Sequence, residues 1–260
     1  MFFVNTFFEK ISKFLNIQPN DCTVLEGEKM KQIMIIDARF KGIAEKEWGE
    51  EFFILPSFEC KNIDKAISFH PDVSVLKVGN SLICAPCVYD YYKEKLAPFG
   101  KNCVKGNTGL DTHYPKDCAY NIAITENSAI FKKGIIDDVA EKMIENEGFS
   151  KIYVNQGYAK CSCAVLKNAV ITADNSIFEA CKAKKIRSLK ITEGHVALKP
   201  YDYGFLGGAT GYFNETMFFF GDICAHPDYL LIEEFLKSEN IKIKYIKNFP
   251  LTDIGTIIFP

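Results

Sequence analysis

The sequence lacks long apolar runs and an excess of charge of either sign. No stretch of about 18 consecutive apolar residues occurs, so no membrane-spanning helix is predicted. The 260 residues carry 31 Lys and Arg against 33 Asp and Glu, which leaves a net charge of -2. Nucleic-acid-binding surfaces need a basic face, so this balance excludes nucleic acid as an expected partner.

The sequence also lacks the regular cysteine spacing of a disulfide framework. Ten cysteines are present, irregularly placed and mostly within apolar segments, unlike those of small secreted domains. We therefore expect free thiols and a cytoplasmic location.

The N-terminus contains no signal peptide by pattern. Glu9, Lys10 and Lys13 interrupt its apolar residues, and no small-residue cleavage site follows. Apolar residues at helical spacing indicate an amphipathic helix in an extension that covers residues 1–30. Packing of this helix on the body and attachment to a membrane surface are the two interpretations.

One unit is repeated along residues 31–260: a hairpin of two apolar strands, a helix and a returning strand. Its turn asparagines are spaced 47, 41 and 46 residues apart, at Asn80, Asn127, Asn168 and Asn214. A period of this length is typical of solenoids and propellers. An incomplete first copy lacks its leading strand, and the chain ends on an unused apolar strand at 254–260. Pairing these two would close a ring and remove exposed sheet edges.

The predicted fold is therefore a single α/β domain, a five-bladed β/α propeller of ββαβ units closed by the C-terminal strand. Helices are expected outside the ring, at 38–50, 88–97, 136–144, 177–183 and 227–238. The expected strands are 33–37, 52–56, 73–78, 81–85, 102–104, 121–125, 128–131, 151–154, 186–191, 211–213, 217–220 and 241–246, with a further hairpin inside 155–174.

Functional residues are expected on the connections that lead from one unit into the next, because such loops emerge on one face of a ring. These connections are 105–117, 155–161, 193–210 and 248–253. Carboxylates and tyrosines around a central opening suit a small cationic or amine-bearing ligand. The alternative is ordinary turn chemistry. The candidate ligand-binding residues are Asp111, His113, Tyr114, Tyr158, Lys160, Tyr201, Asp202 and Asp253.

Cys161 is the candidate nucleophile, with His195 or His113 as its base and Asp117 as the anchor for a cation. The alternative is that this small side chain only packs in a strand. Cys84 and Cys87 form a CxxC at a strand-to-helix junction, where a redox-active pair is one interpretation and simple packing the other. No cofactor and no metal site is predicted.

The glycine-rich segment GFLGGATG at 204–211 lacks the order of a phosphate-binding or dinucleotide-binding motif. We expect its glycines to let the backbone approach the centre of the ring closely.

Five ββαβ units closed by a terminal strand resemble the pentein fold of the guanidino-group-modifying enzymes, which also occurs in a non-enzymatic ribosome-associated factor. GYAKCS, GFLGGATG, FFFGDICAHPDY and PLTDIGTIIFP together resemble an uncharacterised bacterial family assigned to this fold. The resemblance implies a Cys nucleophile on the last strand, a His at the start of the fourth blade, and acidic residues that hold a guanidinium.

The sequence departs from this implied pattern at two of its three positions. The acidic position falls near Asp117, but the histidine position falls at 158–161, where no histidine occurs. The nucleophile position falls near Gly255 and Thr256, and no cysteine follows Cys224. Threonine needs an activating base to act as a nucleophile.

Three hypotheses remain open. The first is a pocket for a small polar ligand, amine- or guanidino-like, without the usual catalytic residues. The second is a hydrolase or deiminase that uses Cys161 as a relocated nucleophile. The third is a non-catalytic module that binds a protein or the ribosome. The sequence leaves the oligomeric state open.

Overall fold

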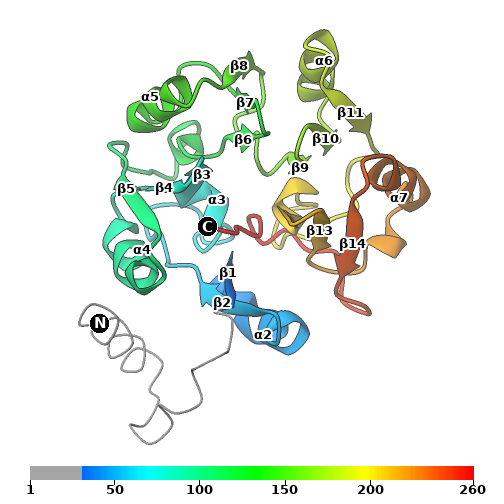
Figure 1. Cartoon of the computed structure of the whole chain (residues 1–260), viewed down its shortest axis with the longest axis horizontal. Helices are drawn as coiled ribbons and strands as arrows, with labels where there is room; N and C mark the ends of the chain where they lie inside the picture. Colours follow the sequence, from blue (N-terminus) through cyan, green and yellow to red (C-terminus); the bar gives the residue numbers. More distant parts are fainter. Residues whose placement is uncertain (1–30) are drawn as a thin grey trace, which may run out of the picture.

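The structure is a computed structural model that describes residues 31–260; the predicted N-terminal helix lies outside the described residues. The described strands form five small sheets around a common centre (Figure 1). The first sheet has two strands and each of the other four has three. Within this part of the chain, no helix is long and apolar enough to cross a membrane.

The elements follow the predicted order of the repeated unit. The strands are β1 (Gln32–Ile36), β2 (Phe52–Pro56), β3 (Val75–Val78), β4 (Ser81–Cys84), β5 (Asn102–Lys105), β6 (Ala123–Ile124), β7 (Ser128–Phe131), β8 (Ser150–Tyr153), β9 (Cys163–Val165), β10 (Ala169–Thr172), β11 (Arg187–Lys190), β12 (Thr210–Phe213), β13 (Thr216–Phe219) and β14 (Lys242–Tyr245). The helices are α2 (Lys41–Trp48), α3 (Pro71–Ser74), α4 (Tyr89–Leu96), α5 (Asp138–Asn146), α6 (Asn175–Ala183) and α7 (Tyr229–Ser238).

Each three-stranded sheet combines an antiparallel hairpin with a parallel return strand. In the second sheet, β3 runs antiparallel to β4 while β4 runs parallel to β5. A parallel return requires a crossover connection, and a helix provides it. These helices lie on the outside of the molecule (Figure 1).

Local chemistry fixes the turns and helix ends. Asn214 and Glu215 both have positive φ, 47° and 55°, as the tight turn between β12 and β13 requires. Asp174 caps α6 by accepting a hydrogen bond from the Ile177 amide at 2.9 Å. Gly148, with φ 76°, follows the last turn of α5.

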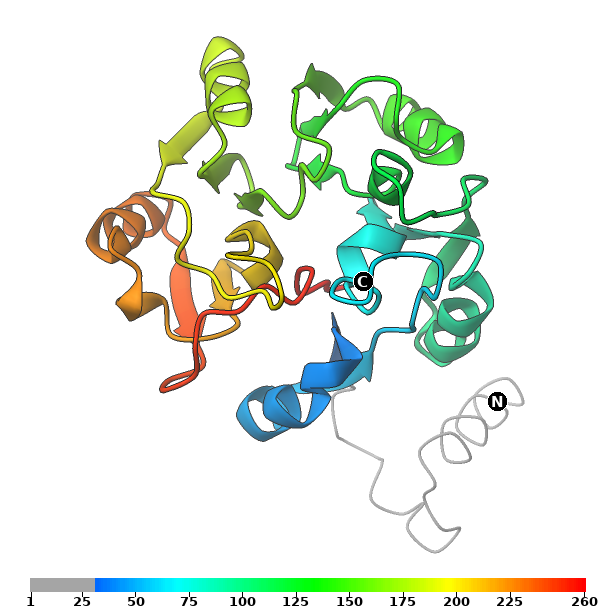
Figure 2. The ribbon, with the colours of Figure 1, turned by 180° about the vertical axis from the view of Figure 1, so that it is seen from behind.

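The C-terminal segment crosses the middle of the molecule and reaches the first sheet (Figure 2). Ile258 and Ile35 exchange two backbone hydrogen bonds, of 2.8 and 3.0 Å. Around this contact, an aromatic cluster packs β1 and β2 against β13, with Trp48, Phe52 and Phe218 in edge-to-face contact. Full burial of each such side chain contributes on the order of 1.5–3 kcal/mol.

One short helix differs from the sequence-based prediction. A strand was expected from residue 73, whereas residues 71–74 form the helical turn α3 and β3 begins at Val75. Pro71 explains the difference, because proline lacks an amide hydrogen for a sheet and its fixed φ suits the first position of a helix. The turn places His70 and Asp72 near the centre of the fold.

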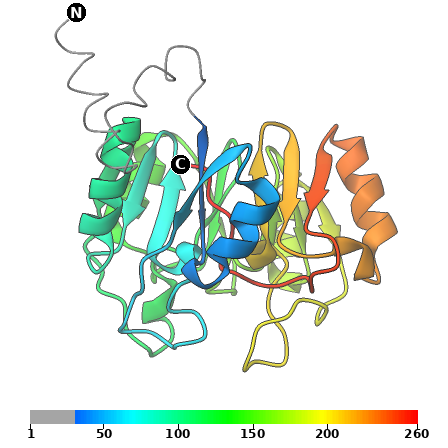
Figure 3. The same cartoon turned by 90° about the horizontal axis from the view of Figure 1, so that it is seen from below.

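The long connections gather on one face. In Figure 3 they project from the lower edge of the sheets, including residues 57–70 and 193–206. The hairpin turns lie at the other end of the strands. We call these the loop face and the hairpin face.

Candidate functional site

A cavity of about 400 Å³ opens on the loop face, and we call it the loop-face pocket. Five residues predicted from the sequence line it: Tyr158, Cys161, Tyr201, Asp202 and Asp253. The remaining lining residues are Ile67, His70, Val73, Leu198, Tyr203 and Phe205. The connections therefore do meet, and they bring aromatic rings together with two carboxylates.

Asp253 is the buried carboxylate of this pocket, with only 2% of its surface exposed. Its two oxygens accept backbone hydrogen bonds from Phe205 at 2.9 Å and from Gly255 at 3.0 Å. Burial, together with the nearby charge of Asp72, raises the pKa of Asp253 to about 7. The side chain thus changes charge near neutral pH.

Glycines of the segment GFLGGATG make room for this carboxylate. A Cβ on Gly208 would lie 1.9 Å from Asp253 Oδ1, and one on Gly204 would lie 2.5 Å from Asp253 Cβ. Both distances are too short for any side chain. The predicted close approach of the backbone is confirmed, and its reason is the Asp253 side chain.

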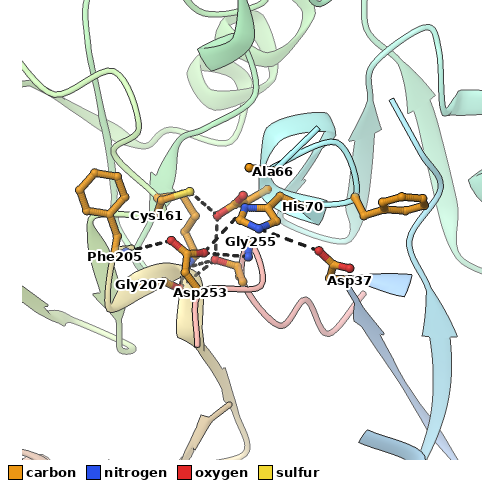
Figure 4. A network of polar contacts seen from close by, with 12 residues as sticks. Asp37, Ala66, His70, Cys161, Phe205, Gly207, Asp253 and Gly255 are labelled. Carbon is orange, nitrogen blue, oxygen red and sulfur yellow. Dashed lines mark hydrogen bonds and ion pairs between the residues drawn. The ribbon is translucent and has the colours of Figure 1, made fainter. Parts of the chain in front are cut away.

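His70 stands between two carboxylates at the inner wall of the pocket (Figure 4). Its Nδ1 lies 3.7 Å from Asp253 Oδ1, and its Nε2 lies 3.9 Å from Asp37 Oδ2. Burial, reinforced by the charge of Arg39, lowers the pKa of His70 to about 3. The imidazole is therefore neutral, and Gly255 lies against its ring with no space for a Cβ.

Sequence reasoning missed His70 and Asp72 because it considered only four connections. The segment that leads into the second hairpin, residues 57–74, occupies the same place in the repeat as residues 105–121 before the third. Applying the repeat to that segment would have included both residues. This was the signal available in the sequence.

Cys161 belongs to a set that we call the polar partition, in which Asp72, Asn121, Cys161 and Thr256 are buried and Lys160 is half-buried. Asp72 Oδ2 receives hydrogen bonds from Cys161 Sγ at 2.9 Å and from Thr256 Oγ1 at 3.0 Å. Asn121 Nδ2 donates to Cys161 Sγ at 3.2 Å, and Lys160 Nζ donates to Thr256 Oγ1 at 2.9 Å. These contacts join four segments of the chain at the centre of the fold: residues 57–74, 105–121, 155–161 and the C-terminal segment that carries Thr256.

Burial controls protonation within the polar partition. It raises the pKa of the Asp72 carboxyl and raises that of the Cys161 thiol well above its ordinary value, while it lowers the pKa of the Lys160 amine. The Cys161 thiol keeps its proton and donates a hydrogen bond to Asp72. A protonated thiol is a weak nucleophile.

Thr256, at the position where the resemblance implies a nucleophile, is 2% exposed and has φ 74°. A β-branched residue rarely adopts this region, and such strain costs on the order of 1–3 kcal/mol. Its hydroxyl lies within hydrogen-bonding distance of Asp72, Lys160 and the Gly207 carbonyl. The hydroxyl is thus held by structural contacts.

A second cavity of about 360 Å³ opens on the hairpin face, and we call it the hairpin-face pocket. Asp72, Lys160 and Thr256 line it together with apolar strand residues such as Val75 and Ile124. The neighbouring residues Cys161 and Lys160 therefore line different pockets, and the polar partition separates the two.

Other predicted residues lie farther out on the loop face. The Tyr158 hydroxyl donates a hydrogen bond to Asp117, so this carboxylate reaches the pocket through the tyrosine. The Tyr114 ring lies 6.2 Å from that of Tyr158 and is half exposed. Asp111 and His113 form an exposed pair, with 3.0 Å between Asp111 Oδ1 and His113 Nδ1.

The structure does not bring the predicted histidines to Cys161. His195 lies against His226, with ring centroids 5.4 Å apart, in a separate cavity of about 250 Å³. The pair of Asp111 and His113 does not line the loop-face pocket. The Cys161 thiol instead contacts the Asp72 carboxylate and the Asn121 amide, so the predicted pairing with the imidazole of His195 or His113 is corrected. No group of three His, Cys, Asp or Glu side chains among residues 31–260 is arranged to hold a metal ion.

Comparisons with solved structures give the fold. A DDAH from Pseudomonas aeruginosa complexed with citrulline aligns with a TM-score of 0.52 and 12% identity, over 84% of this chain and 93% of that one. Agmatine deiminase from C. jejuni aligns with a TM-score of 0.51 and 10% identity, over 84% and 88%. ArgZ, a cyanobacterial arginine dihydrolase, aligns with a TM-score of 0.52 and 9% identity, over 85% of this chain and 37% of that one. These are pentein-fold enzymes, and the chain shares their mixed α/β fold with several small sheets.

The sequence itself places the chain in a family. Residues 35–258 match the family described as "Family of unknown function (DUF6873)", and the chain belongs to it. A search of curated proteins found no match.

Proposed function

We propose that the loop-face pocket binds a small molecule through an amine or guanidinium group. The observation that carries this proposal is Asp253, a buried carboxylate in a pocket otherwise lined mainly by apolar and aromatic side chains. A buried carboxylate is unfavourable, and a bound cation would add to the opposite charge that Lys160 supplies. Asp202, at an exposed position of the same pocket, adds a second negative charge.

The aromatic walls suit the same class of ligand. Tyr158, Tyr201 and Phe205 line the pocket and can offer their ring faces to a cation. The Tyr158 hydroxyl is already bonded to Asp117, so its donor is occupied within the protein. Asp253 and the rings would hold the charged end of the ligand.

Protonation of Asp253 makes the affinity for a cation depend on pH. With its pKa raised to about 7, the carboxyl is largely neutral below that pH and charged above it. A cation binds the charged form, so its affinity rises as the pH increases through 7.

Structural neighbours support the ligand class. The similar DDAH structure holds citrulline, and another neighbour is an agmatine deiminase. Both names refer to compounds of the guanidine and ureido type. The present chain shares the fold of these proteins at low identity.

We infer binding without the covalent chemistry of a thiolate. Cys161 is 4% exposed and its thiol donates to Asp72, and Thr256 is held in the polar partition. Neither side chain has a described imidazole partner. The alternative enzyme with Cys161 as nucleophile would need this hydrogen-bond network to rearrange. The alternative of a non-catalytic module that binds a protein is favoured only if the pocket binds no ligand.

We also infer that the five sheets are the blades of a closed five-bladed propeller. The two hydrogen bonds between Ile35 and Ile258 support closure, because they attach the last segment of the chain to the first sheet.

A thermal-shift series with agmatine, arginine and citrulline tests the proposal. A ligand of the folded state raises the melting temperature as its concentration rises. We expect agmatine or arginine to raise it, more strongly at pH 8 than at pH 6, and citrulline to act less because its side chain is uncharged. Absence of a shift with all three compounds at both pH values would contradict the proposal and favour the protein-binding alternative.

A further inference from the structure

Two cysteines from different units lie in direct contact away from both pockets. Cys60 Sγ and Cys87 Sγ are 2.9 Å apart. Cys60 belongs to residues 57–70 and Cys87 to the junction between β4 and α4, so 26 residues separate them in the sequence. The CxxC pattern suggested Cys84 as the partner of Cys87, but Cys84 instead interacts with Cys103.

The geometry points to Cys60 and Cys87 as a reversible oxidation site that closes to a disulfide. A disulfide bond is about 2.0 Å long, so the two sulfurs need to move together by less than ~1 Å. Cys87 is exposed while Cys60 is buried, which gives an oxidant access to one thiol and keeps the second in place to complete the bond. Both Cys60 and Cys87 are free thiols in the structure.

The contact also shifts the pKa values of the two thiols in opposite directions. The hydrogen bond from Cys87 lowers the pKa of Cys60, and the same contact raises the pKa of Cys87. Cys60 is therefore the thiol whose ionisation the contact favours, and its thiolate completes the disulfide after the exposed Cys87 has reacted.

The reaction with a small disulfide is balanced. The exposed Cys87 thiol first releases its proton to water, and its thiolate then attacks one sulfur of oxidised glutathione, forming a mixed disulfide and releasing the first glutathione thiolate. The Cys60 sulfur then attacks the Cys87 sulfur and releases the second. Two protein thiols are oxidised, one glutathione disulfide is reduced to two thiols, and the two protein protons end on the released glutathione.

A disulfide between Cys60 and Cys87 would restrain one wall of the loop-face pocket. The Cys60 amide donates to the Ser68 carbonyl at 2.8 Å, so Cys60 holds the base of the loop formed by residues 57–70. That loop carries Ile67 and His70, which line the pocket. A bond to the next unit would remove independent movement of this loop.

Peptide mapping after incubation with oxidised glutathione tests the site. Trypsin places Cys60 in the peptide 47–61 and Cys87 in the peptide 78–93. We expect these two peptides to be joined, and dithiothreitol to separate them. The disulfide should also raise the melting temperature by roughly 5–10 °C, because it reduces the conformational entropy of the unfolded chain.

Two variants serve as controls in the full chain. Cys87→Ser should abolish both the linked peptide and the rise in melting temperature. Cys224→Ser, which removes another exposed thiol, should leave both unchanged. A bond between Cys84 and Cys87, which leaves the peptide 47–61 unlinked, would overturn the proposal. So would glutathione that remains on Cys87 without reaction at Cys60.

Discussion

The two pockets lie at opposite ends of the molecule, on either side of the polar partition, and differ in the residues that line them. The loop-face pocket contains Asp253, His70 and several aromatic rings. The hairpin-face pocket has walls of strand side chains such as Val75 and Ile124. Of its charged residues, Glu126 and Lys167 belong to turns, Lys77 to β3, and Asp72 and Lys160 to the polar partition. The polar partition lies between them.

This difference follows from how repeated units meet. Strand interiors must supply apolar side chains to pack, and tight turns tolerate few residue types. The connections on the loop face are longer and carry no such requirement, so buried polar groups can collect there. We therefore place the ligand on the loop face, and the polar partition serves chiefly to join the units.

The largest expected effect comes from breaking the polar partition. Lys160→Met removes a buried amine that bonds Thr256 and lies near the Asp72 charge. A hydrogen bond made by a charged group contributes about 1.5–3 kcal/mol, and the variant also removes the positive charge near Asp72. Lys167→Met, at the exposed hairpin-face turn, should change the free energy of unfolding by no more than about 0.5 kcal/mol. Urea denaturation of both variants measures this contrast, and equal losses would contradict the assigned role of the partition.

A smaller effect is expected from filling the space beside Asp253. Gly208→Ala places a Cβ against the Asp253 carboxylate, and overpacking of this kind costs about 1–3 kcal/mol. Gly109→Ala, also on a loop-face connection, meets no atom within 4 Å and serves as the matched control. The same urea experiment compares the two variants. A Gly208→Ala protein as stable as the control would show that Asp253 does not need this close approach.

The pH dependence of stability should reveal the raised pKa of Asp253. Between about pH 4 and 7 the unfolded chain releases this proton while the folded protein retains it, so the contribution of Asp253 to wild-type stability falls as pH rises. Asp253→Asn removes this contribution. Relative to wild type, the variant should gain roughly 1.4 kcal/mol for each pH unit across that window. Denaturation curves at pH 4.5, 5.5 and 6.5 measure the trend, and parallel stability profiles would contradict it.

Much of the fold could be predicted because the units repeat. The hairpins, helices and return strands were expected at nearly the observed positions, since turn asparagines and apolar periodicity mark them locally. The turn α3 was not expected, because Pro71 interrupts an otherwise apolar segment. Sequence pattern also could not show that Lys160 and Cys161 line opposite pockets, which depends on the direction of each side chain.

The candidate site was predicted in its location and only partly in its chemistry. Tyr158, Cys161 and Asp253 were expected on one face, because connections of equivalent units emerge together. Asp72 was missed because residues 57–74 were not treated as one of the connections, and its contact with Cys161 depends on the direction of both side chains. His195 is a comparable case: its connection is on the predicted face, but its ring packs against His226 in another cavity.

The most direct test of the central claim compares the affinity of agmatine for three proteins by titration calorimetry at pH 8. They are the wild type, Asp253→Asn on the loop face and Glu126→Gln at the hairpin-face pocket. Loss of the buried carboxylate should weaken binding about tenfold or more, as expected for a charge-assisted contact worth at least ~1.4 kcal/mol. Glu126→Gln should bind like the wild type. Weaker binding by Glu126→Gln with unchanged binding by Asp253→Asn would contradict the account and place the ligand at the opposite end of the molecule.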